Sequence, residues 1–453
     1  MSATRRHVLG SMAAALALPR MARAALPRVG IVGGGMAGVA TAWLLDGACE
    51  VTLFEAAPSL GGNARSVPVT QDGHTWAVDL GAQYFHPQAY PAYTALLGQL
   101  GLWPDGAHSF PATITVDAAG ETWPRFVSPL LPGRAWPLLA PWNRAGLAGF
   151  QRLFSAAARR EAAGASYNLA LGDWLARLGL DAAVVQQMLL PWAASLYSGD
   201  VAQTATLSAR SAMSFAALVL PDNPTEPVLY HVLKDGMDEP LRRMQADTHT
   251  VNFRVGSAVT AVQRQADGTL RLQAADGSTA VVDQLVFAAS GEPTLALLAG
   301  LPEAAAQRAA LARLPFHDAR LMLHTDAAYV RADPALRSFL NCRVEGGRCE
   351  ASMDLSGVLA PGPAGQVPTL WKSWVTGRSA LPTQVLHEVP YRHFLATPAA
   401  LRAQGVLARL QGRDGLWIAG GYTRAFDAQE TALQSALDVA AALLPAARPR
   451  LRS

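Results

Sequence analysis

The stretch that decides the fold lies near the N-terminus and reads Arg28-Val29-Gly30-Ile31-Val32-Gly33-Gly34-Gly35-Met36-Ala37-Gly38. An apolar strand over 28–32 runs into a Gly-x-Gly-x-x-Gly turn, and the apolar, Ala-rich residues 39–45 predict a helix. In such a unit Gly33 allows the tight turn, Gly35 lets the backbone approach a pyrophosphate, and Gly38 lets helix and strand pack closely. The helix N-terminus then presents free N–H groups to the phosphates.

A second predicted strand covers 51–54 and ends in Glu55, which lies 22 residues after Gly33. A carboxylate at this distance can accept hydrogen bonds from both ribose hydroxyls of a dinucleotide. With strands on both sides and the acid in place, the glycine run predicts a dinucleotide-binding βαβ unit. NAD and FAD share this pattern, so these residues alone do not choose between them.

The bulk composition is that of a globular protein. The chain has 453 residues, of which 51% are hydrophobic and 16% charged, enough for two or three domains. Four of the 37 lysines and arginines lie in residues 1–24, which contain no acid, so 33 remain against 34 acidic residues. The basic excess therefore belongs to the N-terminal segment, and we expect no nucleic acid as a partner.

Residues 1–24 have the order of an export signal. Arg5 and Arg6 precede the apolar stretch 8–18, and Ala22-Arg23-Ala24 offers small residues for cleavage. We expect a twin-arginine signal peptide cleaved near Ala24, the twin-arginine export machinery as a partner, and a periplasmic or exported protein. The alternative is a basic, Ala-rich helix that stays attached.

The three cysteines, Cys49, Cys342 and Cys349, form no CxxC motif and have no histidine at metal-binding spacing, so no metal site is expected. Cys342 and Cys349 enclose a turn at Gly346 and Gly347. In an oxidising compartment they could form a disulfide. Two free thiols on a hairpin are the other possibility.

Further glycine motifs follow the first unit. Residues 56–65 read Ala56-Ala57-Pro58-Ser59-Leu60-Gly61-Gly62-Asn63-Ala64-Arg65, with a glycine pair six residues beyond Glu55. Later motifs lie at 78–85, which contains Asp79-Leu80-Gly81, and at 235–241, 415–421 and 430–437. Together these motifs resemble those of the flavin-containing amine oxidase superfamily, nearly end to end. The resemblance implies FAD as the cofactor and an FAD-dependent oxidoreductase.

Within this superfamily, Tyr90-Pro91-Ala92-Tyr93, Leu323-His324-Thr325-Asp326 and residues 407–412 most resemble a poorly characterised bacterial group of predicted NAD/FAD-binding flavoproteins. Some positions depart from the usual pattern. Ser59 and Asn63 stand where arginines are common, which makes Arg65 the substitute candidate for the pyrophosphate. Gly421 stands where many relatives have an acid that contacts the ribityl chain.

The resemblance implies FAD contacts from every motif. The backbone of Val259 is expected to meet the adenine, and the helix that opens near Glu430 is expected to point its positive end at the pyrimidine end of the flavin. The expected FAD-binding residues are Gly33, Gly35, Met36, Ala37, Gly38, Glu55, Ala56, Gly62, Asn63, Arg65, Gly81, Ala82, Gln83, Val259, Gly420, Gly421, Glu430, Thr431 and Ala432.

The expected fold class is α/β, with a Rossmann-type FAD-binding domain and an interleaved α+β substrate domain. The expected divisions are 1–24 for the signal peptide, 25–90, 226–300 and 411–445 for the FAD-binding domain, and 91–225 and 301–410 for the substrate domain. The tail 448–452 is expected to be a frayed end.

Catalytic residues are harder to place. Relatives in the superfamily usually set a lysine near the flavin, but His317 lies in the corresponding region here. Lys372, one of only two lysines, is a candidate from another strand, or else a solvated strand residue. Tyr391 and His393 are candidates for the wall beside the ring. Residues 191–200 are expected to line the substrate pocket or to be a helix end with its turn.

Three functions fit these features. The first is an exported, amine oxidase-like enzyme that takes a hydride from a small or apolar substrate and passes electrons to oxygen or a quinone. The second is an FAD-dependent desaturase or isomerase that acts on a lipid-like substrate. The third is a flavin-binding partner without turnover.

Overall fold

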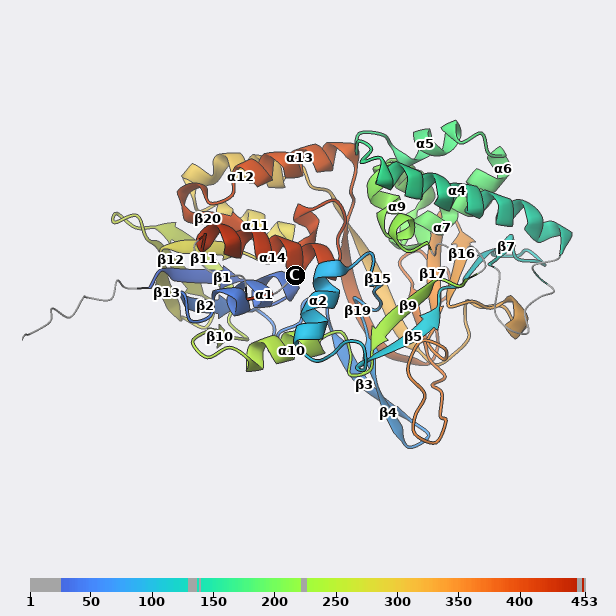
Figure 1. Cartoon of the computed structure of the whole chain (residues 1–453), viewed down its shortest axis with the longest axis horizontal. Helices are drawn as coiled ribbons and strands as arrows, with labels where there is room; N and C mark the ends of the chain where they lie inside the picture. The colour runs from blue at the N-terminus through green and yellow to red at the C-terminus, as the bar shows by residue number, and fades with distance from the viewer. Residues whose placement is uncertain (1–25, 129–136, 138–139, 221–225, 446–449, 452–453) are drawn as a thin grey trace, which may run out of the picture.

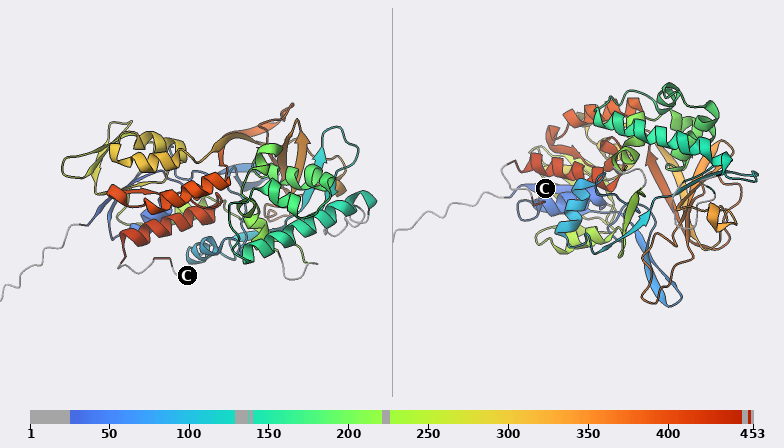
Figure 2. Two further views of the ribbon diagram at one scale, coloured as in Figure 1. Left: turned by 90° about the horizontal axis from the view of Figure 1, so that it is seen from above. Right: turned by 45° about the vertical axis from the view of Figure 1, so that its right-hand side comes forward.

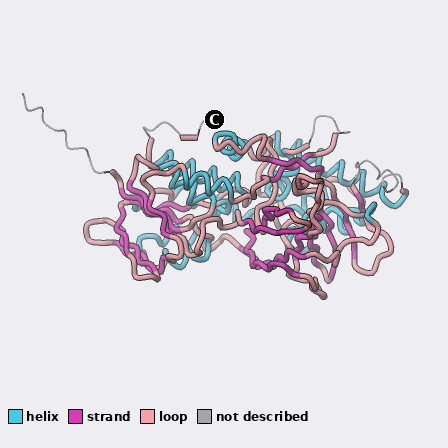
Figure 3. Tube along the Cα trace, turned by 90° about the horizontal axis from the view of Figure 1, so that it is seen from below, coloured by secondary structure: helices cyan, strands magenta, loops and turns pink. Residues whose placement is uncertain are grey.

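The computed structural model describes residues 26–128, 137, 140–220, 226–445 and 450–451. The predicted signal peptide and its cleavage site lie outside the described residues. The molecule is elongated, with two groups of strands at its two ends and helices around each (Figures 1 and 3).

A five-stranded parallel sheet forms one half of the molecule. Its strands run in the order β10 (Asn252–Arg254), β2 (Glu50–Phe54), β1 (Arg28–Val32), β14 (Gln284–Phe287) and β20 (Leu416–Ile418). The expected βαβ unit is present as β1, α1 (Met36–Leu45) and β2. The α/β fold class with a Rossmann-type sheet is thereby confirmed.

Both faces of this sheet are buried, which explains why its strands read as nearly continuous apolar runs. Val29 and Ile31 point into a core that includes α1, α2 (Pro91–Gln99) and α14 (Gln429–Leu443). Val32 and Phe287 point into the opposite core. That core also holds residues of the small antiparallel sheet β11 (Val259–Arg264), β12 (Leu270–Ala274) and β13 (Thr279–Val282), and of α11 (Gly291–Leu298), α12 (Ala305–Leu311) and α13 (Pro398–Arg409).

The other half is built on a mixed sheet. Its strands run in the order β19 (Val385–Phe394), β15 (Phe316–His324), β18 (Trp371–Trp374), β17 (Arg348–Asp354), β16 (Leu340–Glu345), β6 (Ile114–Ala118) and β7 (Phe126–Val127), and β8 (Gly199–Asp200) pairs with β17. The helices drawn in green in Figure 1 gather beside it, namely α4 (Arg144–Ala162), α5 (Leu171–Arg177), α6 (Ala182–Val184), α7 (Leu190–Ser195), α8 (Val201–Ala205) and α9 (Ala209–Leu218).

Two β-ribbons and a further α-helix also belong to the described fold. The ribbons are β3 (Ser66–Gln71) with β4 (His74–Asp79), and β5 (Ala107–Pro111) with β9 (Leu229–Leu233). The helix is α10 (Glu239–Ala246), which packs on α1. The ribbons lie between the two groups of strands (Figure 1), and the blue hairpin of β3 and β4 projects from the body in the right-hand view of Figure 2. Within the described residues, none of the helices has the length and apolar character needed to cross a bilayer.

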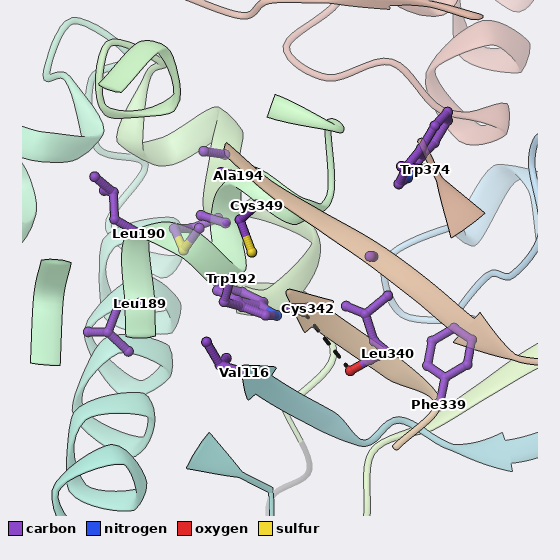
Figure 4. Close-up of a cluster of buried hydrophobic side chains, with 14 of the residues drawn as sticks. Val116, Leu189, Leu190, Trp192, Ala194, Phe339, Leu340, Cys342, Cys349 and Trp374 are labelled. Atoms are coloured by element: carbon purple, nitrogen blue, oxygen red, sulfur yellow. Dashed lines mark hydrogen bonds between the residues drawn. The ribbon is translucent and has the colours of Figure 1, made fainter. Parts of the chain in front are cut away.

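Cys342 and Cys349 lie in the core of the second half (Figure 4). They belong to the expected hairpin, whose turn consists of Gly346 and Gly347, both with positive φ. Both are free thiols, and Cys342 accepts a hydrogen bond from Ser195. The register pairs Val344 with Cys349 and Cys342 with Ala351, so the two cysteines are diagonal neighbours, a spacing too wide for a relaxed disulfide.

The prediction of a frayed C-terminal tail is wrong for Arg450 and Leu451. The Arg450 guanidinium donates to the carboxylates of Asp46 and Asp247 and lies over the ring of Trp43. Leu451 is buried in the core beside α1. Charge pairing and stacking therefore hold this segment on the end of α1, which its basic, Pro-containing sequence did not indicate.

Candidate FAD and substrate site

A large cavity of about 1060 Å³ runs between the two halves of the molecule. Its lining begins at the glycine turn after β1 and ends among aromatic side chains of the second half. At the glycine turn it passes the carboxyl ends of β1, β14 and β20, where parallel α/β sheets bind their ligands.

The three glycines of the first motif have three different reasons to be glycine. Gly33 has a φ of +114°, and a Cβ there would press on the backbone of Ala288. A Cβ on Gly38 would collide with the carbonyl oxygen of Gly33, so Gly38 serves helix packing and does not line the cavity. A Cβ on Gly35 would meet no protein atom closer than 3.7 Å. The protein alone therefore does not require glycine at 35, whereas a group bound in the cavity beside it would.

Glu55 stands at the same edge of the cavity. Its carboxylate accepts hydrogen bonds from the N–H groups of Gly34 at 2.5 Å and Ala57 at 2.8 Å. Val259 lies in the lining between Ala258 and Thr260. The residues predicted to hold the ribose and the adenine are therefore brought to one end of the cavity.

The glycine pair Gly61–Gly62 packs against the glycine turn that follows β1. The Gly61 N–H donates to the Gly34 carbonyl at 2.9 Å, and Gly62, with a φ of +58°, lies against Gly35. Gly62 and Asn63 line the cavity, as predicted. Arg65 is exposed and does not line it, so the structure does not bring this arginine to the expected pyrophosphate position.

Asp79 joins two motifs that are far apart in sequence. Its buried carboxylate accepts hydrogen bonds from the Met237 N–H at 2.8 Å and from the Ser66 hydroxyl at 2.6 Å. Burial raises the pKa of Asp79 above its usual value. These bonds fix the loop that continues to Gly81, Ala82 and Gln83, three predicted residues that line the cavity.

Lys372 lies behind that loop. Its ammonium donates to the carbonyls of Asp79 at 2.8 Å and Gly81 at 3.4 Å, and burial lowers the pKa of Lys372. The interpretation as a solvated strand residue is wrong, because the residue is only 1% exposed. Lys372 does not line the cavity, so its contact with the loop makes it a positioning residue.

The C-terminal glycine motif, Gly420-Gly421, forms the turn after β20, and the chain then leads into α14. Gly420, Gly421 and Ala432 line the cavity together with Asp427, Ala428 and Gln429. Glu430 does not line the cavity, and its carboxylate accepts hydrogen bonds from the N–H groups of Ala92 and Tyr93 at the start of α2. The Thr431 hydroxyl accepts the N–H of Ala428 and thereby caps its own helix. The side chains of these two predicted FAD-binding residues are thus used within the protein.

Aromatic side chains form the far end of the cavity in two walls. In one wall Tyr84 and Tyr230 stack with ring centres 4.8 Å apart, and Phe339 meets Tyr84 edge on at 5.5 Å. In the other wall, Trp374 meets His393 edge on at 4.8 Å. Both walls line the cavity, as do Trp192, Leu196 and Tyr197 from the expected pocket segment 191–200.

The ring-side candidates have separate positions. Tyr391 lines the cavity, and its hydroxyl occupies the space that a Cβ on Gly81 would take. His393 also lines it, and burial lowers the pKa of its imidazole to about 3, which keeps the ring neutral. His317 does not reach the cavity, because its Nε2 atom lies 2.7 Å from the carbonyl oxygen of Tyr197.

Sequence reasoning missed several lining residues. Tyr84, Phe215, Tyr230 and Phe339 come from four separate segments, and only Tyr84, directly after the Asp79 motif, carried a local signal. Asp427 was also missed. Within the described residues no group of His, Cys, Asp or Glu side chains is arranged to hold a metal ion.

The sequence profile of the flavin containing amine oxidoreductases matches residues 36–319, more than half of the chain. The chain belongs to this family. FAD is accordingly its cofactor, and the free space beside Gly35, the carboxylate of Glu55 and the N-terminus of α14 fit that molecule. As a member of this family, the chain is an FAD-dependent oxidoreductase.

Solved structures with the same fold include other members of the amine oxidase type. A putrescine oxidase with bound putrescine has a TM-score of 0.65 at 16% identity, over 93% of this chain and 99% of that one. A cyclohexylamine oxidase from Brevibacterium oxydans has a TM-score of 0.62 at 15% identity, over 92% and 99%. A fatty acid isomerase from P. acnes that produces CLA has a TM-score of 0.62 at 14% identity, over 90% and 97%. No curated protein sequence matches the chain significantly.

Proposed function

We propose that this protein is an exported amine oxidase-like enzyme that oxidises an uncharged, largely apolar substrate, such as a monoamine in its neutral form, and passes the electrons to oxygen or a quinone. The observation that carries the substrate class is the aromatic end of the cavity, formed by Tyr84, Tyr230, Phe339, Trp374 and His393. FAD, when bound, supplies the acceptor for the hydride.

The aromatic side chains of the far end are themselves uncharged near neutral pH. Burial raises the pKa of Tyr84 and of Tyr197 to about 12, so both phenols stay protonated. His393 is neutral, as described above. A large apolar substrate body is bound there by exclusion of water from aromatic surface. A charged ammonium group gains at most cation–π contacts from these residues and no carboxylate partner.

The described lining contains two carboxylates, Glu55 and Asp427. Glu55 directly follows β2 and Asp427 lies two residues before α14, so both belong to the cofactor half. A diamine needs a negative partner for its second ammonium group, and the aromatic segments contribute none. The site therefore favours an amine of the cyclohexylamine kind over one of the putrescine kind.

The alternative is a desaturase or isomerase that acts on a lipid-like chain. The same uncharged aromatic lining favours it, and a fatty acid isomerase shares the fold. The two functions differ in electron balance, since an isomerase returns the hydride to its substrate while an oxidase passes two electrons to an acceptor.

The test is anaerobic mixing of the purified, FAD-loaded protein with cyclohexylamine, putrescine or a polyunsaturated fatty acid, followed at the flavin absorption band. We expect bleaching with cyclohexylamine and little with putrescine, and hydrogen peroxide on admission of air if oxygen is the acceptor. Equal bleaching by putrescine would contradict the substrate class. Conversion of the fatty acid without net bleaching would establish the alternative. Gly35→Val, which leaves no room for the cofactor, is the control for flavin-independent turnover.

A further inference from the structure

Asp427 is an accessible carboxylate in the lining of the cavity. It makes no hydrogen bond or ion pair to any described residue, and much of its surface is open to the cavity that it lines. Burial raises the pKa of Asp427 to about 6. Once a ligand fills the cavity and displaces water, this carboxylate is costly unless the ligand donates a hydrogen bond to it.

Its position is defined by the turn after β20. One carboxylate oxygen occupies the space in which a Cβ on Gly421 would lie. Gly421 has no left-handed backbone conformation, so glycine there is explained by this neighbour and by the nearby backbone of Ala428. The carboxylate of Asp427 thus stands where a side chain from residue 421 would otherwise project.

The order of the binding sites along the cavity indicates which part of FAD lies beside Asp427. The glycine turn after β1 and the pair Gly61–Gly62 enclose the pyrophosphate position, and the aromatic walls lie at the far end of the cavity. The Gly420–Gly421 turn also borders the cavity, at the carboxyl end of β20. Between its pyrophosphate and its ring, FAD carries a chain of hydroxyl groups. A carboxylate can accept hydrogen bonds from these hydroxyls.

We propose that Asp427 binds the ribityl hydroxyls of FAD and so supplies, from the turn before α14, the carboxylate that residue 421 lacks. This proposal rests on FAD as the cofactor and does not depend on the substrate. A carboxylate that instead received a protonated substrate amine would leave the retention of FAD unchanged.

The test measures the rate of FAD release from the holoenzyme, read as the rise of free-flavin fluorescence in the absence of substrate. We expect Asp427→Ala and Asp427→Asn to release FAD about 10-fold to 100-fold faster, the range for loss of a hydrogen bond to a charged group. Unchanged release in both variants, together with slower flavin reduction by substrate, would overturn the proposal and assign Asp427 to the substrate.

A relocation experiment separates this role from general damage to the fold. In Gly421→Glu/Asp427→Ala the new side chain enters the space that Asp427 vacates, and we expect FAD release to slow again towards the wild-type rate. The matched control is Gly421→Ala/Asp427→Ala, which has the same backbone change without a carboxylate and should release FAD as fast as Asp427→Ala. Equal release by both double variants would contradict a carboxylate role.

Discussion

The Nζ atom of Lys372 lies 2.8 Å from the carbonyl oxygen of Asp79, a residue 293 positions earlier in the chain. The contact holds the loop of Gly81, Ala82 and Gln83 against the cavity from behind. Lys372 therefore fixes this loop from inside the protein, and its charge lies near the buried carboxylate of Asp79.

We expect Lys372→Met to lower the free energy of unfolding by about 3 kcal/mol and to weaken FAD retention, because the substitution leaves buried carbonyl groups and the Asp79 carboxylate without their cation. Chemical unfolding followed by circular dichroism measures the first effect and flavin release the second. The other lysine is the matched control, since exposed Lys234→Met should change stability by less than about 1 kcal/mol. A variant of normal stability and flavin content that is not reduced by substrate would show that Lys372 acts in the chemistry instead.

Two glycines of the first motif should respond in opposite ways to the same substitution. Gly35→Val is expected to fold but to purify without FAD, since its side chain projects into free space where the pyrophosphate must lie. Gly38→Val is expected not to fold, because its side chain meets the Gly33 carbonyl. The flavin absorption of the soluble protein distinguishes them, and a yellow Gly35→Val protein would contradict the assignment.

Glu55→Ala should also purify without FAD, because it removes the acceptor for the ribose hydroxyls at the end of β2. Glu50→Ala, at the exposed start of the same strand, is the control and should retain the cofactor. The measurement is the ratio of flavin to protein absorbance after purification. Full flavin content in Glu55→Ala would mean that the ribose is held by other groups.

The neutral imidazole of His393 predicts an acid-sensitive component of stability. Its pKa is about 3 in the folded protein, against about 6.5 when unfolded, so the unfolded chain binds the extra proton between these values and stability falls as pH is lowered through this window. Between pH 7 and pH 5 we expect this residue to cost the wild type about 1–2 kcal/mol. His393→Phe should lose that component in urea unfolding at the two pH values. His249→Phe, on the surface, should keep the wild-type pH dependence.

The export proposal predicts a defined precursor. Replacing Arg5 and Arg6 together by lysine should leave flavin-loaded precursor in the cytoplasm, since paired arginines define the twin-arginine route. Cell fractionation with flavin fluorescence of the fractions measures it. A normal periplasmic yield of this variant would show that the leader uses another route.

The last prediction concerns the electron acceptor. One complete Gly-x-Gly-x-x-Gly unit is present in the sequence, and we assign it to FAD, so a second nucleotide site is not expected. The N-terminus of α14 borders the cavity, and its positive end favours a negatively charged reduced flavin. Stopped-flow reoxidation should therefore be fast with oxygen or a quinone and unaffected by NAD⁺ or NADP⁺. Rapid flavin reduction by NADPH at micromolar concentration would contradict this.

Features set by neighbouring residues were predictable from the sequence, and features set by distant contacts were not. The roles of Gly33, Gly35 and Gly38 follow from local backbone geometry, so the motif alone gave the cofactor end of the site. Glu430 is different, because the amides that bind its carboxylate lie 337 and 338 positions earlier. No pattern around Glu430 indicates that contact.

Charge and burial were the hardest properties to predict. The scarcity of lysine drew attention to Lys372, but its burial depends on the loop around Asp79, which only the fold brings near. Asp427 has no motif of its own, and it became a candidate only when the structure placed its carboxylate beside Gly421. The aromatic walls likewise come from segments whose tryptophans and tyrosines read as ordinary core residues.

The strand order of the parallel sheet also bears on how the protein is made. Arg28 in β1 pairs with Asp283, 255 residues later, and the outer strand β20 begins only at Leu416. A ribosome must therefore synthesise nearly the whole chain before this sheet and its cofactor pocket can close. Folding of this half is expected to be largely post-translational and slow, since it depends on contacts between distant segments. A translocation route that threads chains as they emerge would carry the polypeptide away before it could hold FAD.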